Sequence, residues 1–195
     1  IHVVGNPIRS NMKKLPLPDQ QKFCIFIFGG SQGAVGINTA VMRAVELLGE
    51  QAQKVQWIHQ TGQKDFERVK NFYASQGLEA RIEPFIYDME GAYRVASLVI
   101  CRAGASSLAE LSAVGRPAIL VPLPTAADDH QRLNAQVFSA SGAAFLVEQN
   151  ENAAAEVTRI IHELIQKPDQ IHQIAEKMHR HYRSDSALKI VEVLA

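Results

Sequence analysis

The sequence predicts an α/β protein with a doubly wound, Rossmann-like parallel sheet of six strands. Short apolar runs alternate with longer segments of helical spacing from residue 23 onward, which is typical of strands joined by crossover helices. The runs are continuously apolar, as expected of strands that helices cover on both faces. For six such strands the expected order is 3-2-1-4-5-6.

Each element is predicted from its own residues. Strands are expected at 23–28, 55–59, 81–86, 97–101, 118–121 and 143–147. Helices are expected at 35–48, 65–76, 88–95, from the 102–107 run to Gly115, and at 131–141, 153–166, 169–182 and 186–194. Residues 1–20, with three prolines, are expected to be a linker, residues 21–166 the Rossmann-like domain, and residues 167–195 helices that pack back on it.

Composition excludes several classes of protein. Twenty basic and twenty acidic residues among 195 give a net charge of zero, so no charge excess indicates a nucleic-acid partner. No apolar run approaches the roughly 18 residues of a membrane span. Cys24 and Cys101 are far apart in apolar runs, which favours buried, reduced thiols in a cytosolic protein. The chain begins at Ile1, so we interpret it as a fragment or an excised domain.

A glycine-rich loop, Gly29–Ala34, follows the first strand at the expected switch point of the sheet. Such a loop can bring backbone N–H groups and a helix start toward a phosphate, or it can simply make a tight corner. No Gly-Lys-Ser/Thr follows, so it is not a Walker loop. The glycine spacing fits the dinucleotide fingerprint badly, and the second strand ends without an acid for a ribose, which disfavours a redox enzyme.

Glu110 follows the fourth strand, near the start of a helix at the same switch point. Its carboxylate could accept two hydrogen bonds from a ribose diol. Ser107 and Glu110 also have capping-box spacing, and on the residues alone this is the preferred interpretation. After the fifth strand, His130 and Gln131 could contact a sugar, or the segment could be an ordinary loop capped by Asp128 or Asp129.

Other patterns exclude further chemistry. No Asp-x-Asp occurs, which counts against a metal-dependent glycosyltransferase. The histidines near the carboxyl terminus lack a compact metal-ligand spacing. We interpret residues 177–183, which are basic, as a solvated helix end.

A series of motifs resembles a known family. In chain order the motifs are Gly5–Arg9, Gly29–Ala34, His59–Gly62, Phe85–Met89, Cys101–Ala105 with Glu110, Gly115–Ala118, and Asp128–Gln131 with Asn134 and Ala135. Together they resemble the carboxyl-terminal half of the MurG family, over about residues 3–148. These are bacterial enzymes that transfer N-acetylglucosamine to lipid I and make lipid II for peptidoglycan.

The resemblance implies a GT-B architecture, in which this half binds UDP-N-acetylglucosamine and a missing amino-terminal domain binds lipid I. It implies inversion at the anomeric carbon, no metal or other cofactor, no nucleic-acid partner, and a peripheral position on the cytoplasmic face of the inner membrane. No catalytic residue is expected in this chain, because the base belongs to the missing domain. The chain is therefore expected to bind the donor without turning it over.

The resemblance also assigns roles to residues. It implies that Glu110 holds the ribose and that the backbone of Ile86, beside Phe85, contacts the uracil. The sugar hydroxyls would meet His130 and Gln131. The residues expected near the diphosphate are Arg9, Gly30, Ser31, Gln32, Gly33, Gly104, Ala105, Ser106 and Ser107.

The chain departs from the family pattern at two places, and other functions stay open. Some family members have Gln-Gln in place of His130-Gln131, and Arg102-Ala103-Gly104 replaces a variant that contains Ser. The first departure changes a side chain expected at the sugar, and the second removes one hydroxyl. The alternatives are another UDP-sugar enzyme of the same architecture, such as a lipid glycosyltransferase or a UDP-N-acetylglucosamine 2-epimerase, and a non-catalytic binding subunit.

Overall fold

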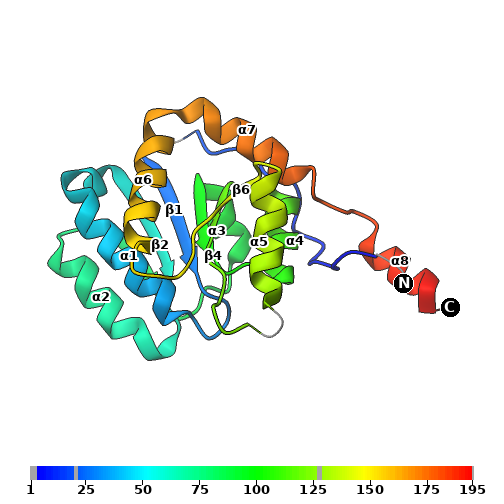
Figure 1. Cartoon of the computed structure of the whole chain (residues 1–195), viewed down its shortest axis with the longest axis horizontal. Helices are drawn as coiled ribbons and strands as arrows, with labels where there is room; N and C mark the ends of the chain where they lie inside the picture. Colours follow the sequence, from blue (N-terminus) through cyan, green and yellow to red (C-terminus); the bar gives the residue numbers. More distant parts are fainter. Residues whose placement is uncertain (1–3, 20–21, 127–128, 195) are drawn as a thin grey trace.

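A computed structural model describes residues 4–19, 22–126 and 129–194 and contains the predicted parallel sheet (Figure 1). Its strands lie in the order β3-β2-β1-β4-β5-β6, which confirms the prediction, and neighbouring strands are parallel. The strands are β1 (Phe23–Phe28), β2 (Val55–Gln60), β3 (Ala80–Glu83), β4 (Leu98–Cys101), β5 (Ala118–Leu120) and β6 (Ala144–Leu146).

Helices connect the strands and continue after the last one. They are α1 (Val35–Leu48), α2 (Phe66–Ser75), α3 (Met89–Val95), α4 (Ala105–Val114), α5 (His130–Ala140), α6 (Ala153–Gln166), α7 (Pro168–His179) and α8 (Ser186–Leu194). Short 3-10 helices, η1 (Gly49–Lys54) and η2 (Gln63–Asp65), precede β2 and α2 and were not predicted. The predicted bounds of α1, α6 and α8 are confirmed, and the others differ by a few residues.

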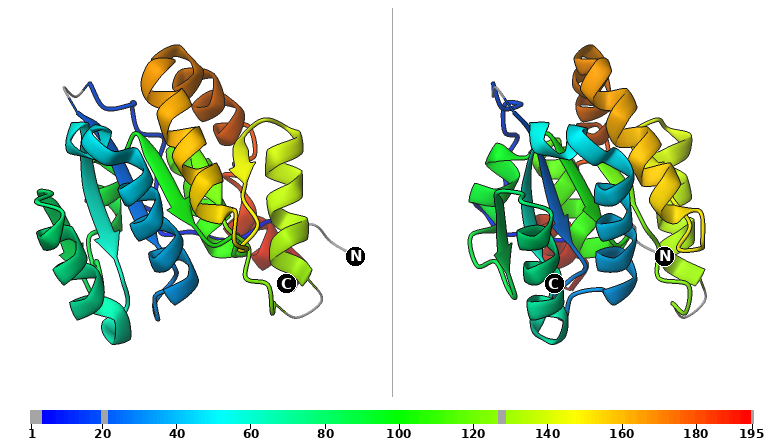
Figure 2. Two further views of the ribbon diagram at one scale, coloured as in Figure 1. Left: turned by 60° about the vertical axis from the view of Figure 1, so that its left-hand side comes forward. Right: turned by 90° about the vertical axis from the view of Figure 1, so that its left-hand side faces the viewer.

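Two apolar clusters cover the two faces of the sheet, and β1 contributes to both. Ile25 and Ile27 point into a cluster with residues of α1, α2 and α6. Cys24, Phe26 and Phe28 point into the other, with residues of α3, α4 and α5. The left view of Figure 2 shows α1 and α6 in front of the sheet. Burial on both faces explains why the strand is continuously apolar.

Both cysteines are buried and free, as predicted. Burial raises the pKa of the Cys24 thiol to about 12 and moves that of Cys101 upward as well, because the thiolate form is poorly solvated in the core. None of the helices in the described part of the chain has both the length and the apolar character needed to cross a membrane.

The third strand ends earlier than predicted, at Glu83 instead of residue 86. Pro84 has no N–H to donate to a strand ladder. Its carbonyl accepts from the backbone N–H of Gly62 at 3.1 Å, and the N–H of Ile86 turns toward a side chain on β2. The chain therefore leaves the sheet at Pro84, and Ile86 belongs to a loop.

The leading segment, residues 4–19, packs on the domain. Met12 and Leu15 lie in the cluster beneath α3 and α4. The buried guanidinium of Arg116 donates to the carbonyls of Tyr93, Leu15 and Pro16 at 2.7, 3.1 and 2.6 Å. Burial lowers the pKa of Arg116 to about 10. The cation is stabilised by the dipoles of these three carbonyls. The predicted boundary at residues 20–21 lies outside the described residues.

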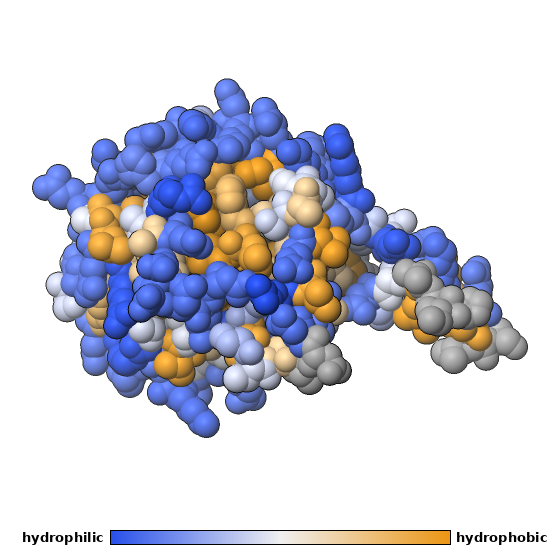
Figure 3. Space-filling model, in the orientation of Figure 1, coloured by the Kyte–Doolittle hydropathy of each residue, from blue (hydrophilic) through white to orange (hydrophobic). Residues whose placement is uncertain are grey.

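The basic run at 177–183 is not simply a solvated helix end. Helix α7 stops at His179, and Met178 is fully buried in the cluster beneath α4. The ring of His179 bonds the carbonyl of Ser112 at 2.9 Å. The chain then leads to α8, which extends from the body beside the leading segment (Figures 1 and 3).

Candidate functional site

The loops that follow β1, β2, β3, β4 and β5 all leave the same edge of the sheet, because the strands are parallel. The last residue of β1, Phe28, pairs with Gln60 of β2 on one side and with Cys101 of β4 on the other. The loops after these three strands therefore begin side by side. This edge holds the predicted switch point between β1 and β4.

The glycine-rich loop after β1 makes a tight turn whose tip faces solvent. Gly33 donates its N–H to the carbonyl of Gly30 at 3.0 Å, and both have positive φ, +75° and +93°. A Cβ on Gly33 would lie 2.1 Å from the carbonyl oxygen of Thr61, whereas one on Gly30 would meet nothing within 4 Å. Ser31 and Gln32, at the tip, are exposed. The loop is thus both a corner and an accessible surface.

Helices α1 and α4 begin at this edge with open amino-terminal turns. Their cap residues, Ala34 and Gly104, provide no side-chain hydrogen bond, and neither first turn contains an acidic residue. The first N–H groups of a helix lack partners inside it and carry a partial positive charge. The predicted residues Ala105 and Ser106 are exposed at the start of α4, with Ser107 half-buried. Two such starts beside the switch point favour an anion there.

The capping-box interpretation of Glu110 is wrong. Helix α4 starts at Ala105, so Ser107 is the third residue of the helix and not its cap. Glu110 is the sixth residue of the helix, about one and a half turns after its amino terminus. The backbone N–H groups there already bond within the helix, so none is available to the Glu110 carboxylate. Its carboxylate instead contacts side chains of other segments.

Glu110 is held from two sides on the surface of α4. The buried hydroxyl of Tyr93 donates to its Oε2 at 3.2 Å, and the Arg9 guanidinium lies 3.8 Å from its Oε1. Burial, together with the nearby Glu110 charge, raises the pKa of Tyr93 well above its ordinary value, so the phenol keeps its proton. The Glu110 side chain is 14% exposed, and that of Arg9 is 59% exposed. The structure therefore brings the predicted residues Arg9 and Glu110 together.

The loop after β3 brings Phe85 and Ile86 to the same edge. Phe85 is 39% exposed, and its ring meets that of Tyr87 edge-on at 4.8 Å between centroids. The side chain of Ile86 is buried, and its N–H donates to Oε1 of Gln60 at 2.9 Å. No described residue donates to the Ile86 carbonyl.

The predicted sugar-contacting residues lie at the start of α5. His130 is exposed, and Oε1 of Gln131 accepts from the backbone N–H of Leu123 at 3.0 Å. Asp129 occupies the cap position with a φ of +51° but makes no side-chain cap, so the predicted aspartate cap is wrong for this residue. Asp128 lies outside the described residues.

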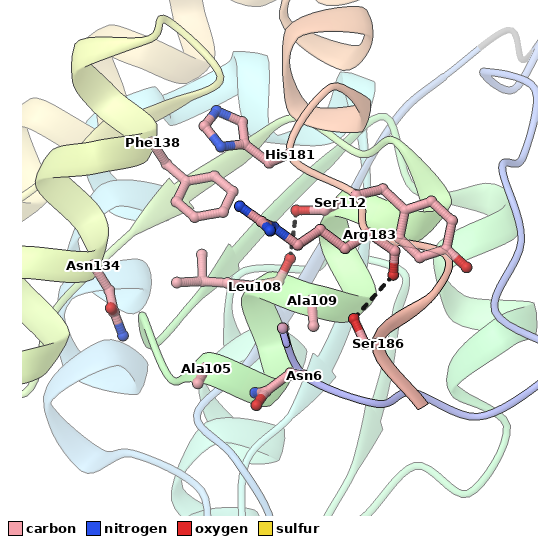
Figure 4. Close-up of a pocket in the computed structure, with 12 residues that line it drawn as sticks. Asn6, Ala105, Leu108, Ala109, Ser112, Asn134, Phe138, His181, Arg183 and Ser186 are labelled. Atoms are coloured by element: carbon pink, nitrogen blue, oxygen red, sulfur yellow. Dashed lines mark hydrogen bonds between the residues drawn. The ribbon is translucent and has the colours of Figure 1, made fainter. Parts of the chain in front are cut away.

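A cavity of about 290 Å³ lies beside this edge, between α4, α5 and the connection that leads to α8 (Figure 4). Ala105 is the one predicted site residue that lines it. Asn134 also lines it, and its side-chain amide donates to the Ala103 carbonyl at 3.1 Å. Farther along, His181 stacks on Phe138 at 4.3 Å. The predicted residues thus form an open surface that borders the cavity without lining it.

A buried polar network supports the loop after β2. The His59 ring contacts the side-chain oxygen of Asn38 at 3.0 Å and the hydroxyl of Tyr73 at 3.3 Å. Asn38 donates to the Thr61 carbonyl at 3.0 Å and to Asp65 at 2.7 Å. Burial lowers the pKa of His59 to about 3, so the ring is neutral at pH 7. Within the described ranges, no three His, Cys, Asp or Glu residues gather as metal ligands do.

The sequence analysis did not predict a role for Gln60 or Tyr93. Both are buried side chains whose polar ends reach predicted site residues, Ile86 and Glu110. The only signal in the sequence was a polar residue at the end of an apolar strand, and an aromatic residue inside a short helix. Neither pattern indicates which loop the side chain meets.

Comparison with known proteins agrees with this geometry. The family described as "Glycosyltransferase family 28 C-terminal domain" matches residues 24–191. The chain belongs to this glycosyltransferase family. The family match covers the sheet from Cys24 onward and each of the helices α1 to α7, and it ends within α8.

Relatives within the glycosyltransferase family confirm the predicted resemblance. A protein of Myxococcus xanthus is 36% identical over 99% of this chain, and one of Trichlorobacter lovleyi is 42% identical over 89%. Both are named UDP-N-acetylglucosamine–N-acetylmuramyl-(pentapeptide) pyrophosphoryl-undecaprenol N-acetylglucosamine transferase. The chain spans 51% and 46% of their lengths, about half of each.

Solved structures confirm the predicted fold. The crystal structure of MurG from Acinetobacter baumannii matches 97% of this chain with a TM-score of 0.80 and 32% identity, and the match covers 54% of that chain. A UDP-N-acetylglucosamine 2-epimerase from Neisseria meningitidis matches 91% of this chain and 45% of its own, with a TM-score of 0.61. At 16% identity this second likeness concerns the fold alone.

Proposed function

We propose that this chain is the donor-binding domain of an inverting, metal-independent glycosyltransferase. The complete enzyme would move N-acetylglucosamine from UDP-N-acetylglucosamine to lipid I and make lipid II for peptidoglycan. The relatives' names support this choice of donor and acceptor. In this proposal the acceptor site and the base belong to a second, amino-terminal domain, and the complete enzyme acts at the cytoplasmic face of the membrane.

One observation carries the proposal: two helix starts without caps or acids flank the switch point, and Glu110 lies between Arg9 and Tyr93 on α4. The leaving diphosphate gains negative charge as the sugar departs. Helix amino termini and backbone N–H groups can stabilise that charge, which is the role a metal has in other transferases. Glu110 would accept from the ribose hydroxyls.

The remaining predicted residues complete a binding mode. The uracil would lie against Phe85 with its edge toward the backbone of Ile86. Ser31 and Gln32, at the tip of the glycine-rich turn, would meet the diphosphate together with Arg9 and the start of α4. The sugar hydroxyls would meet the exposed His130 and the neighbouring Gln131.

Calorimetric titration tests the proposal. The chain is titrated with UDP-N-acetylglucosamine, UDP, UDP-glucose and NAD in the presence of EDTA. We expect saturable binding of the uridine ligands and none of NAD. Glu110→Ala should weaken UDP binding at least tenfold, because two charge-assisted hydrogen bonds to the ribose are lost.

Two controls sharpen this titration. Glu176→Ala removes a surface carboxylate on α7 that pairs with Lys14, so it should not change UDP binding. Mixing the chain with a soluble lipid I analogue and labelled donor should give no product. A folded chain that binds no uridine ligand, or that loses none of its affinity in Glu110→Ala, contradicts the proposed donor site.

A further inference from the structure

Gln60 is a buried side chain that joins two loops of the candidate site. It is the last residue of β2 and is 3% exposed. Its Nε2 donates to the Gly30 carbonyl at 2.9 Å, and its Oε1 accepts from the Ile86 N–H at 2.9 Å. One amide therefore spans from the glycine-rich turn after β1 to the loop after β3.

The position of Gln60 explains how one side chain reaches both loops. Strand β2 lies between β1 and β3, and Gln60 pairs in register with Phe28 on one side and Glu83 on the other. It thus stands level with the ends of both neighbouring strands. A side chain one strand farther out would reach only one of the loops.

Backbone hydrogen bonds next to Gln60 join the loop after β2 to the end of β3. Thr61 and Gly62 donate their N–H groups to the carbonyls of Glu83 and Pro84 at 3.0 and 3.1 Å. These bonds hold the start of the loop after β3. They do not reach Ile86, whose N–H has Gln60 as its partner.

We propose that Gln60 is the positioning residue that sets the base-recognising backbone of Ile86 relative to the diphosphate turn at Gly30. This inference rests on the proposed function, because it assumes that a uracil lies at Ile86 and a diphosphate at Gly30. In that arrangement Gln60 does not touch the ligand. It determines the distance between the two places where the ligand is held.

Positioning of Ile86 has a consequence for the choice of base. Its carbonyl, free of donors from the described residues, can accept the N3–H of uracil. Cytosine presents a lone pair at the same atom, so it would repel that carbonyl. A loop that moves freely would lose this discrimination along with affinity.

The test compares UDP with CDP in wild type and Gln60→Met. Methionine has a similar length and makes neither hydrogen bond, so both loops lose their common anchor. We expect UDP affinity to fall about tenfold and the ratio of UDP to CDP affinity to fall toward one. A merely structural role would weaken both ligands equally and leave the ratio unchanged.

Gln60→Glu provides a second variant that tests the donated bond alone. A glutamate keeps an acceptor for Ile86 but can donate to the Gly30 carbonyl only when it is protonated. We expect its UDP affinity, relative to wild type at the same pH, to rise as the pH is lowered from 8 to 5. Thr158→Val is the matched control. It removes a partly buried hydroxyl that donates to the Ala154 carbonyl in α6 at 2.7 Å and to the Ala44 carbonyl in α1 at 3.4 Å, and it should bind like wild type.

Amide hydrogen exchange separates the possible failures. In the unliganded protein, Gln60→Met should speed exchange of the Ile86 N–H at least tenfold while β1 amides stay protected. Unchanged exchange at Ile86, or an unchanged UDP to CDP ratio in a folded variant, overturns the role of Gln60. A wild-type chain that binds no UDP overturns the proposed function and this inference with it, whereas UDP binding with an unchanged ratio overturns the inference alone.

Discussion

Among the helices that start at the carboxyl edge of the sheet, α1, α3 and α4 start in two ways. Helix α3 begins behind Asp88, whose carboxylate accepts from the Gly91 N–H at 2.8 Å, with Glu90 in its first turn. Helices α1 and α4 begin behind Ala34 and Gly104, with no side-chain cap and no acid. Of these three helix starts, one is therefore closed by its own side chain and two are left open.

The difference between capped and open helix starts affects folding stability and anion binding in opposite directions. A capped start satisfies an orphan N–H inside the protein and is worth about 1 kcal/mol. An open start gives up that stabilisation, and its N–H groups stay available to an anion from outside. The open starts of α1 and α4 flank the switch point, where an α/β sheet binds its ligand.

The largest expected effect on ligand binding comes from closing an open start. Ser106→Asp puts a carboxylate in the first turn of α4, where it complements the helix dipole but repels a diphosphate. We expect UDP binding to weaken about a hundredfold, or about 2.7 kcal/mol, with no loss of folding stability. Calorimetric titration with UDP and urea unfolding measure the two quantities.

Two controls accompany Ser106→Asp. Ser106→Ala removes the hydroxyl without adding charge and should weaken UDP binding far less. Asp88→Ala opens the start of α3 and should cost about 1 kcal/mol of stability without changing UDP affinity. If Ser106→Asp binds UDP as wild type does, the open start of α4 is not the diphosphate site.

The turn before α1 provides a pair of glycines with different surroundings. Gly33→Ala combines a positive φ with a Cβ that would meet the Thr61 carbonyl oxygen, whereas Gly30→Ala has the positive φ alone. We expect Gly33→Ala to lower the free energy of unfolding by at least about 3 kcal/mol and Gly30→Ala by about 1 kcal/mol. Equal losses in urea unfolding would mean that the contact with Thr61 does not hold the turn.

The buried network beneath α1 is expected to make folding stability depend on pH. His59 has a pKa of about 3 in the folded protein and about 6.5 when unfolded. Between these values the unfolded chain binds a proton that the folded chain does not, so stability is full above pH 6.5 and falls as the pH is lowered. The expected slope is at most about 1.4 kcal/mol per pH unit.

Chemical unfolding between pH 7.5 and 4.5 measures that slope, and His59→Gln should flatten it. Burial also lowers the pKa of His181, which acts in the same direction. His181→Gln is therefore the matched control and should keep most of the slope. A slope that His59→Gln leaves intact would assign the acid sensitivity to another group.

Local sequence patterns predicted the bounds of a helix or strand well where burial of its apolar side chains alone sets those bounds. The apolar run of β1 and the helical spacing of α1 gave correct bounds, because burial on known faces dictates both. The capping box failed, since a Ser-x-x-Glu pattern has the same spacing inside a helix as at its start. The predicted end of β3 was wrong because the Ile86 N–H donates to the side chain of Gln60, 26 positions earlier in the chain, and not to a neighbouring strand.

The residues of the sequence alone determined the doubly wound sheet, its strand order and the edge at which a ligand would bind, since these follow from hydrophobic periodicity and the handedness of crossovers. Only the tertiary structure decided that Tyr93 holds Glu110, that Gln60 joins two loops, and that α1 and α4 start uncapped. The physical reason is that these contacts join residues from different elements. A polar side chain on one strand or helix carries no local sign of the backbone group that another element brings to it.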